Sequence, residues 1–358
     1  MHALLDNYFK FVKRIVPSGY QGSVVGLEIG GGACKAVELR RKADDFEVLR
    51  WQAQTVDAPE EKAVLEKLAS SWGLSSNQRQ VITAVSGKGT LIRYIDMPRM
   101  PLAELKRAFL IEADKYFPFP KDTVYIDCCI LDPRNVDKRM SVLIAAVKKD
   151  VLDAKHKLLK SSGIDVAAVT LSSIAVANAF VTFQPSRNTG KPSGVEGQTT
   201  AILDIGDSVT NLMIMTGNMP RFNRDIFTGT QDAYKRVANV TGVSPAEARG
   251  IVASPGDKRE AVVQGIAAFM DGLVSELRLS FDYFNTEKNL QVGQILVIGE
   301  GAILPGVETI FQERFDMPIV SWNPFDGIGL SADVEKSELI VQSPRLVTAL
   351  GLALNEYD

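Results

Sequence analysis

The sequence repeats one short pattern in its two halves, and this repeat constrains the fold more than any other feature. Residues 25–39 (VGLEIGGGACKAVEL) align without a gap with residues 201–215 (AILDIGDSVTNLMIM). In both, an apolar strand ends in an acidic residue, one apolar residue and a glycine, and a small polar turn leads into a second strand. Glu28 thereby aligns with Asp204. Such an internal repeat indicates that the two halves of the chain are built on one plan.

The residue types in the two turns are typical of a polyphosphate site. Small residues let backbone N–H groups approach phosphate oxygens, because no side chain stands in the way. A carboxylate at the strand end can hold Mg²⁺ through water, since Mg²⁺ prefers oxygen ligands and dehydrates reluctantly. We therefore predict that Glu28 and Asp204 hold a magnesium ion. The predicted phosphate-binding residues are Gly30, Gly31, Gly32, Ala33 and Lys35 in the first hairpin, and Gly206, Asp207, Ser208, Thr210 and Asn211 in the second.

A single hairpin of this kind is a weak signal, since many hairpins look alike. Two at matched positions, facing each other across a cleft, would clamp a polyphosphate from both sides. Lys35 keeps two interpretations: its ammonium group reaches the phosphates, or it is an exposed charge on a strand.

A third glycine-containing turn lies nearer the C-terminal end. An apolar strand predicted over residues 294–298 runs into Gly299, Glu300, Gly301 and Ala302, before a helix predicted over residues 308–315. Glycines let the backbone lie against a flat base and a ribose. By itself, the segment is also explained by a strand-to-helix turn that needs a positive φ. Together with the two hairpins, it indicates an adenosine site.

The 358 residues are too many for one ordinary core and predict two domains. Residues 184–198, rich in glycine, proline, serine and threonine, are predicted to be a loop or linker. Strands and helices alternate, which predicts an α/β fold. Further strands are predicted at 46–55, 80–86, 91–97, 124–131 and 140–147, and helices at 60–72, 102–116, 150–162, 344–354 and over much of 230–286.

The composition excludes several classes of protein. The net charge of −3 carries no basic excess, so we expect no nucleic-acid partner. Three cysteines without a CxxC pattern and two histidines leave little material for a zinc site, a disulfide framework or a His-based hydrolase. Residues 166–183 form the most apolar stretch, but polar residues interrupt it, so we expect no transmembrane helix.

Residues 1–20 are predicted to form a short amphipathic helix, because apolar residues recur there at helical spacing. Either this helix packs on its own domain, or it binds a membrane surface or a partner. Lysine and arginine residues interrupt any apolar region, so the segment is not typical of a signal peptide.

The three turns, in this order, resemble the phosphate 1, phosphate 2 and adenosine motifs of the superfamily of actin, sugar kinases and heat-shock chaperones. Within it, the chain is similar to the PilM family, the actin-like components of type IV pilus assembly. The most discriminating segment is 112–120, EADKYFPFP. Other similar segments are 222–226 (FNRDI) followed by Gly229, 276–284 (ELRLSFDYF), 323–325 (NPF) and 346–354.

The resemblance implies an actin-like ATPase fold, in which two RNase H-like domains flank a nucleotide cleft and a small α+β subdomain is inserted in the first. The expected divisions are an N-terminal segment (1–22), a first domain (23–91 and 163–198), an inserted subdomain of PilM and FtsA type (92–162), a second domain (199–235 and 287–358) and a helical subdomain (236–286).

The resemblance also implies function. ATP and Mg²⁺ are the expected cofactors. The expected partner is a PilN-like inner-membrane protein, whose short cytoplasmic tail would bind in a groove near residues 90–170, and self-association is a further expectation. The protein would be cytoplasmic and peripheral to the inner membrane, and at most a slow ATPase, because no residue stands out as a base that activates water.

The sequence departs from the family pattern at several of these positions. Glu28 stands where the family usually has aspartate, and Glu300 replaces a glycine, so that its side chain either points outward or crowds the phosphates. Glu247 either accepts hydrogen bonds from a ribose or is a solvated charge at a helix start. Gly250 occupies a usual lysine position, for which Arg249 is a candidate replacement, and Thr170 replaces an aspartate.

Three other functions stay open at this point. A small-molecule kinase on the same fold would need a carboxylate base beside its acceptor hydroxyl, and none stands out. An FtsA-like, membrane-associated cytoskeletal protein is the second alternative. The third is a degenerate actin-like scaffold that does not bind nucleotide.

Overall fold

The computed structural model describes residues 22–42, 45–56, 58–75, 79–131, 138–183 and 198–354. The helix predicted over residues 1–20 and nearly all of the predicted linker at 184–198 lie outside the described residues. The chain divides into two compact units. The first comprises residues 1–183, 325–340 and 346–358, and the second residues 184–324 and 341–345. Each unit is described by itself.

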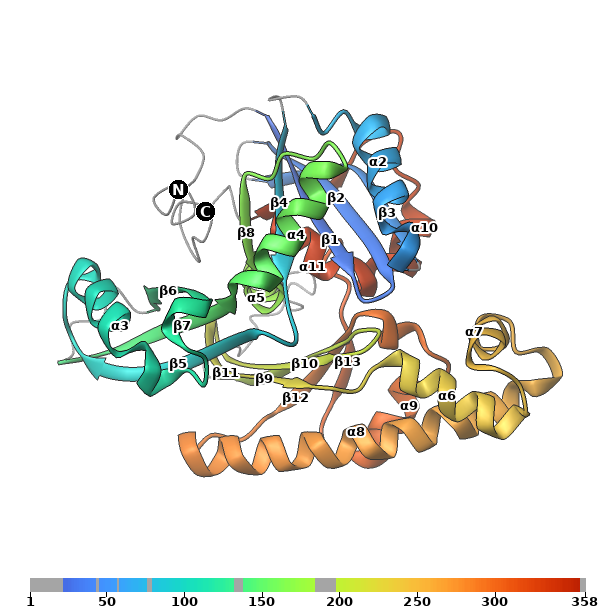
Figure 1. The fold of residues 1–358 in the computed structure, drawn as a ribbon. Coiled ribbons are helices and arrows are strands. Elements are labelled where there is room, and N and C mark those ends of the chain that lie inside the picture. The colour runs from blue at the N-terminus through green and yellow to red at the C-terminus, as the bar shows by residue number, and fades with distance from the viewer. Residues whose placement is uncertain are drawn as a thin grey trace. The chain divides into compact units, whose positions relative to one another are not determined.

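Within the described residues, the first unit has a six-stranded sheet whose inner strands are rich in valine, isoleucine and leucine (Figure 1). The order across the sheet is β14 (Gly329–Leu330), β3 (Asp45–Thr55), β2 (Ala33–Lys42), β1 (Ser23–Gly30), β4 (Arg79–Val85) and β8 (Ala168–Leu171). The strands β1, β2 and β3 are antiparallel neighbours, and β1, β4 and β8 are parallel. The sheet therefore begins with the predicted hairpin and continues as a parallel sheet.

Helices cover both faces of this sheet. One face packs against α2 (Glu61–Trp72) and α4 (Lys149–Ser161), and the other against α5 (Ser172–Thr182) and α11 (Val347–Leu354). Helix α11 is buried along its whole length. Its backbone comes so close to β1 that a Cβ atom on Gly26 would lie 1.9 Å from the carbonyl oxygen of Ala349. A glycine is therefore required at this crossing.

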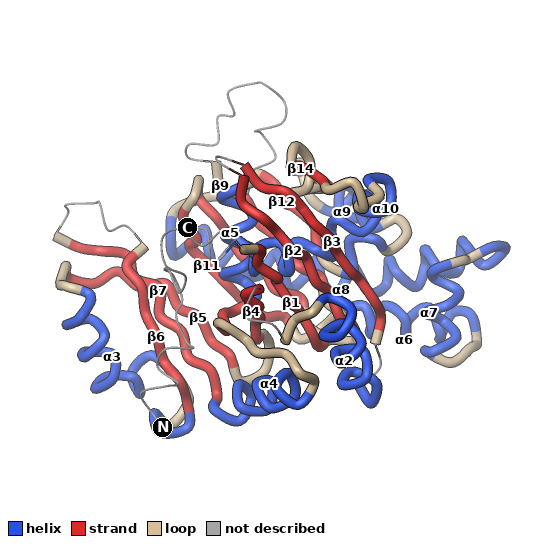
Figure 2. The backbone as a smooth tube through the Cα atoms, turned by 90° about the horizontal axis from the view of Figure 1, so that it is seen from above, coloured by secondary structure: helices blue, strands red, loops and turns tan. Residues whose placement is uncertain are grey.

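A smaller sheet of the first unit, here called the small sheet, has the antiparallel order β5 (Thr90–Pro98), β7 (Arg139–Lys148), β6 (Val124–Ile130). Helix α3 (Leu102–Tyr116) packs beside it, as Figure 2 shows. Side chains of β7 alternate between two cores: Val142 and Ile144 pack with α3, whereas Leu143 and Ala145 pack with α2 and α4. Strand β7 thus ties the small sheet to the main one.

The second unit repeats the plan of the first. Among the described residues its sheet has the order β11 (Met219–Ile226), β10 (Thr210–Thr216), β9 (Thr199–Ile205), β12 (Gln294–Ile298), β13 (Ile319–Ser321). The first three are antiparallel neighbours and the last three parallel, as in β3-β2-β1-β4-β8. The repeat seen in the sequence therefore extends to the topology of both sheets.

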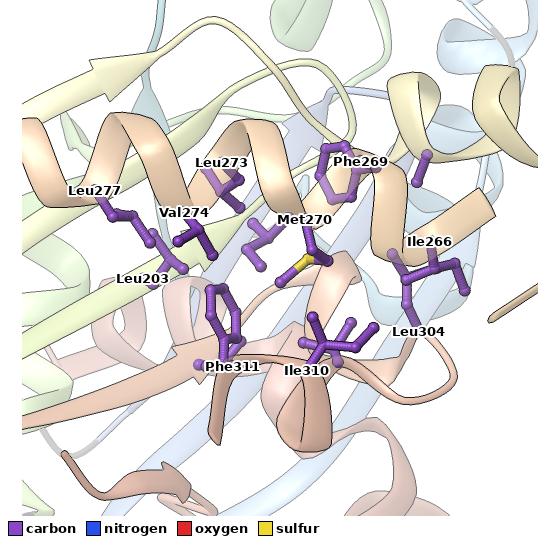
Figure 3. Close-up of a cluster of buried hydrophobic side chains, with 14 of the residues drawn as sticks. Leu203, Ile266, Phe269, Met270, Leu273, Val274, Leu277, Leu304, Ile310 and Phe311 are labelled. Carbon is purple, nitrogen blue, oxygen red and sulfur yellow. The ribbon is translucent and has the colours of Figure 1, made fainter. Parts of the chain in front are cut away.

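The core of the second unit lies between this sheet and its helices, α6 (Thr230–Thr241), α7 (Pro245–Ala253), α8 (Arg259–Lys288) and α9 (Val307–Arg314). Helix α8 presents Met270, Leu273 and Leu277 at helical spacing, and Figure 3 shows them packed toward Leu203 of β9 and Phe311 of α9. One apolar stripe of α8 thus fixes both the sheet and α9.

Some elements differ from the predictions. The apolar stretch at 166–183, to which no strand or helix was assigned, forms β8 and α5, and β11, β13, β14 and α10 (Lys336–Gln342) were not predicted. The helix predicted over 344–354 begins as a 3₁₀ turn, Ser343–Leu346, before α11. Within the described parts of the chain, every helix is too short or too polar to cross a membrane.

Candidate functional site

The first turn, between β1 and β2, consists of three glycines in a conformation that other residues rarely adopt. The φ angles of Gly30, Gly31 and Gly32 are 119°, 59° and 73°. The backbone N–H of Val56 donates a hydrogen bond of 2.9 Å to the carbonyl oxygen of Gly32 and closes the turn. Gly30 and Gly31 are exposed and carry no side chain, so a phosphate group can approach their backbone closely. Ala33, which follows, is buried.

Two of the predicted residues lie opposite each other beside this turn. Glu28 and Lys35 are cross-strand partners, and Lys35 Nζ lies 3.6 Å from Glu28 Oε2. Lys35 is only 6% exposed, so the interpretation as an exposed strand charge is wrong. Within the described residues, Glu28 Oε2 accepts no hydrogen bond. The ion pair leaves this carboxylate oxygen with capacity for a further ligand.

The structure adds a cation that was not predicted from the sequence. Lys155, on α4, donates a hydrogen bond from Nζ to the carbonyl oxygen of Ile29, directly before the glycine turn. Burial lowers the pKa of Lys155, although the carboxylates of Glu28 and Glu61 act in the opposite direction. Burial raises the pKa of the neighbouring Cys34 thiol to about 12, so Cys34 stays protonated. The first turn is therefore flanked by two amines, that of the buried Lys35 and that of the half-buried Lys155.

The second turn, between β9 and β10, is held by the start of α6. The N–H groups of Thr230 and Gln231 donate to the carbonyl oxygens of Gly206 and Asp207 at 3.0 and 2.9 Å. A Cβ atom on Gly229 would lie 2.5 Å from the backbone of Asp207, so only a glycine fits there. This turn is fixed by main-chain contacts, whereas the first is open.

The carboxylate of Asp207 is directed into the protein. It accepts a hydrogen bond of 2.7 Å from Gln231 Nε2, and an Arg249 nitrogen lies 3.7 Å from its Oδ1. Burial raises the pKa of Asp207, and the hydrogen bond from Gln231 and the charge of Arg249 oppose the shift. Arg249 also stacks over Tyr234, 5.4 Å from the ring centre. Arg249 thus provides a cation beside the second turn, where Gly250 offers none.

The other residues predicted at the second turn lie on β10 or just before it. Ser208 is exposed. Thr210 is fully buried, and its hydroxyl donates to the carbonyl oxygen of Thr228 at 2.8 Å. Asn211, the cross-strand partner of Asp204, donates from Nδ2 to Asp225 Oδ1 at 2.7 Å. The amide of Asn211 therefore forms part of a polar cluster on the sheet.

The third turn lies directly against the end of β9. Gly299 has a φ of 84°, and a Cβ atom there would lie 2.3 Å from Asp204 Oδ1. A Cβ atom on Gly301 would lie 2.3 Å from Ile205 Cγ2, and Ala302 follows in a short 3₁₀ turn. The structure thus brings the predicted adenosine turn together with Asp204 of the second hairpin.

Glu300, between these glycines, does not point outward as one interpretation proposed. Its side chain is 14% exposed, and its Oε2 lies 2.8 Å from Nε of Arg345, which is 10% exposed. Arg345 also donates to Gln342 Oε1 at 2.6 Å. The negative charge of Glu300 is compensated inside the protein by Arg345.

Glu247 caps the start of α7. Its carboxylate accepts a hydrogen bond of 2.9 Å from the backbone N–H of Ser244, while the Ser244 hydroxyl accepts from the Glu247 N–H at 3.3 Å. The hydrogen bond from the Ser244 backbone lowers the pKa of Glu247. These contacts explain a glutamate at a helix start, and its ribose contact stays a prediction.

With this geometry in view, comparison with known proteins identifies the family. The model of the family "Type IV pilus assembly protein PilM" matches residues 26–357. The chain belongs to the PilM family. A solved PilM–PilN type IV pilus biogenesis complex is similar in structure, with a TM-score of 0.80 and 22% identity over 94% of this chain and 99% of that one.

A second solved structure, the ethanolamine utilization protein EutJ from Carboxydothermus hydrogenoformans, has a TM-score of 0.53 and 14% identity over 96% of this chain and 92% of that one. Both likenesses concern the fold. With the duplicated sheet topology, they confirm the predicted actin-like fold.

The residues of the first turn fit the phosphates and magnesium ion of a nucleotide. The first turn offers exposed glycine backbone beside two lysines, and one oxygen of Glu28 is without a hydrogen bond among the described residues. Direct coordination by a cluster is not indicated: the described part of the chain has no group of three histidine, cysteine, aspartate or glutamate residues placed to hold a metal ion. This donor set suits a hydrated magnesium ion, which needs few protein ligands.

Two basic residues beside these turns, Lys155 and Arg345, were not predicted from the sequence. Both are far along the chain from the residues they contact, Ile29 and Glu300. No local pattern marks either one. Only the uncommon Glu300, a charge in a turn of small residues, signals that a compensating cation is needed nearby.

Proposed function

We propose that this protein binds ATP with Mg²⁺ and takes part in type IV pilus assembly by docking the cytoplasmic tail of a PilN-like inner-membrane protein. Membership of the PilM family over residues 26–357 carries the proposal. The three glycine turns supply its chemistry. The protein would then act at the cytoplasmic face of the inner membrane, held there by its partner.

In the nucleotide site, each turn has a distinct task. The backbone of Gly30–Gly32, with Lys35, binds phosphate oxygens. Glu28 and Asp204 are the carboxylates that would hold a magnesium ion. The third turn, held by Gly299 and Gly301 against β9, forms the surface for the adenosine. A bound magnesium ion would supply charge neutralisation for the phosphates.

We do not expect the protein to hydrolyse ATP rapidly. Phosphoryl transfer requires a group that positions the attacking water, in addition to charge stabilisation. Asp207 is directed into the protein and bonded to Gln231, and Thr170, where the family often has an aspartate, is a buried hydroxyl. These residues support a protein that binds nucleotide and turns it over slowly at most.

The small sheet is the region where we place the partner. The related protein was solved as a PilM–PilN complex. On α3, Leu102 and Ile111 are 45% and 77% exposed, and such apolar side chains suit the binding of a peptide. For the nucleotide to change partner binding, ATP must have different affinities for two conformations of the protein.

The test is a titration of a fluorescent peptide, made from the cytoplasmic tail of the PilN-like partner, with and without saturating Mg²⁺ and ATP. We expect saturable binding and at least a threefold change of Kd on addition of ATP. Equal Kd values in both conditions would disprove the nucleotide sensitivity, and absence of binding would disprove the choice of partner.

A further inference from the structure

Among the described residues, Lys155 is a half-buried amine without a counter-ion in contact. Glu28, Glu61 and Cys34 are the titratable groups there that act on its ammonium group, from β1, α2 and β2. None of them forms an ion pair with Lys155, and the hydrogen bond it donates goes to a neutral carbonyl, that of Ile29. Burying a charge is unfavourable unless it is paired. Such a cation is suited to an anion that arrives from outside.

The position of Lys155 indicates which kind of anion it would bind. The Ile29 carbonyl directly precedes three glycines with positive φ, of which Gly30 and Gly31 are exposed. Lys35 lies beside the same strand end, but it is already paired with Glu28. A phosphate at this turn would therefore contact one lysine that is already paired and one that is not. The contact with the unpaired lysine would contribute more to the binding of the phosphate.

The helix that carries Lys155 is tied to the small sheet. Strand β7 ends at Lys148 and α4 begins at Lys149, with no residue between them. Leu152 and Leu159 of α4 pack in the same core as Leu143 and Val147 of β7. Because β7 and α4 are continuous and share a core, a shift of β7 would be passed on to α4 and to the amine of Lys155 at the turn.

We propose that Lys155 binds the phosphates of the nucleotide at the first turn, and that α4 makes this contact sensitive to the position of the small sheet. The inference rests on the proposed function, because it assumes that the ligand is a nucleotide. It adds a phosphate-binding residue and a route between the partner region and the nucleotide.

The test compares ATP binding, with Mg²⁺, by calorimetry for the wild type, Lys155→Met, Lys155→Arg and the control Lys157→Met. Lys157 is exposed on the same helix. We expect Lys155→Met to weaken ATP binding at least tenfold, Lys155→Arg to keep it within about threefold, and Lys157→Met to leave it unchanged. Methionine keeps the apolar stem of lysine, so the melting temperature should not fall.

Three results would overturn the inference. Unchanged ATP affinity in Lys155→Met would show that the amine does not bind phosphate. A loss of affinity in parallel with a fall in melting temperature, without recovery in Lys155→Arg, would show that it only holds the Ile29 carbonyl. Absence of ATP binding by folded wild type is a different result, because it would reject the proposed function itself.

Discussion

Glu300 and Arg345 form a nearly buried ion pair, 2.8 Å between Oε2 and Nε, that joins the third glycine turn to the segment before α11. In the same segment, the carbonyl oxygen of Pro344 accepts a hydrogen bond of 2.8 Å from the Gly299 N–H. The turn is thus fixed at two consecutive residues. The charge of the glutamate is neutralised by the same contact that holds the turn in place.

Removing one partner of this ion pair should lower the free energy of unfolding more than removing both partners. We expect Arg345→Met to lower the free energy of unfolding by about 3 kcal/mol, because it leaves the Glu300 carboxylate buried without its cation. The double variant with Glu300→Gln should recover at least half of the loss. Urea denaturation of the wild type, the two single variants and the double variant measures the coupling. Additive losses would contradict an ion pair at this position.

Gly299 should tolerate no side chain. Its φ is 84°, and a Cβ atom on it would lie 2.3 Å from Asp204 Oδ1. Gly299→Ala is therefore expected to lower the free energy of unfolding by about 2–4 kcal/mol. Gly250→Ala is the matched control, because Gly250 lies in α7 with open space around it. It should stabilise the protein by about 0.5–1 kcal/mol. Equal effects of the two substitutions would contradict the packing of the third turn.

The affinity for ATP should fall at alkaline pH because of Lys155. Its pKa is lowered by burial, so the amine loses its proton at a lower pH than an ordinary lysine does. The loss of charge weakens the binding of phosphate. In Lys155→Arg the guanidinium stays protonated, and the decline should be smaller. Calorimetry from neutral pH upward tests this, and parallel pH profiles of wild type and Lys155→Arg would exclude the role.

Lys155 should also connect nucleotide and partner. In the wild type, we expect ATP to change the Kd of the partner's tail peptide. In Lys155→Met, the Kd without ATP should match the wild type, while the effect of saturating ATP should largely disappear, because the turn no longer contacts α4 through a phosphate. Peptide titrations at ATP concentrations that saturate each variant measure this. If ATP changed the Kd of the peptide in Lys155→Met as much as in the wild type, the coupling between nucleotide and partner would not depend on Lys155.

Much of the fold was predictable because it is repeated and local. The hairpins around Glu28 and Asp204 marked the centre of each sheet, and the topology of the two sheets then followed the same plan. The stretch at 166–183 was harder, because β8 is buried and α5 is apolar on most sides, so no periodicity separates strand from helix.

The chemistry of the turns was only partly predictable. The positions of the glycines and carboxylates follow from local backbone requirements, and adjacent residues in the sequence indicate these requirements. The partners of these groups cannot be recognised from adjacent residues. The positions of Lys155 and Arg345 and the inward direction of Asp207 depend on packing between segments that are distant in sequence. The glycine turns and the carboxylates beside them were therefore predictable from the sequence, but the charges that surround them were not.

The central claim is that the residues of the three turns bind ATP with Mg²⁺, and calorimetric titration into wild type, Asp204→Ala and the control Asp257→Ala tests it most directly. Asp257 is an exposed acid of the same unit. We predict saturable binding by the wild type and the control, and at least a tenfold weaker Kd, about 1.4 kcal/mol, for Asp204→Ala. Absence of binding by folded, nucleotide-free wild type, or equal binding by Asp204→Ala, would contradict the account.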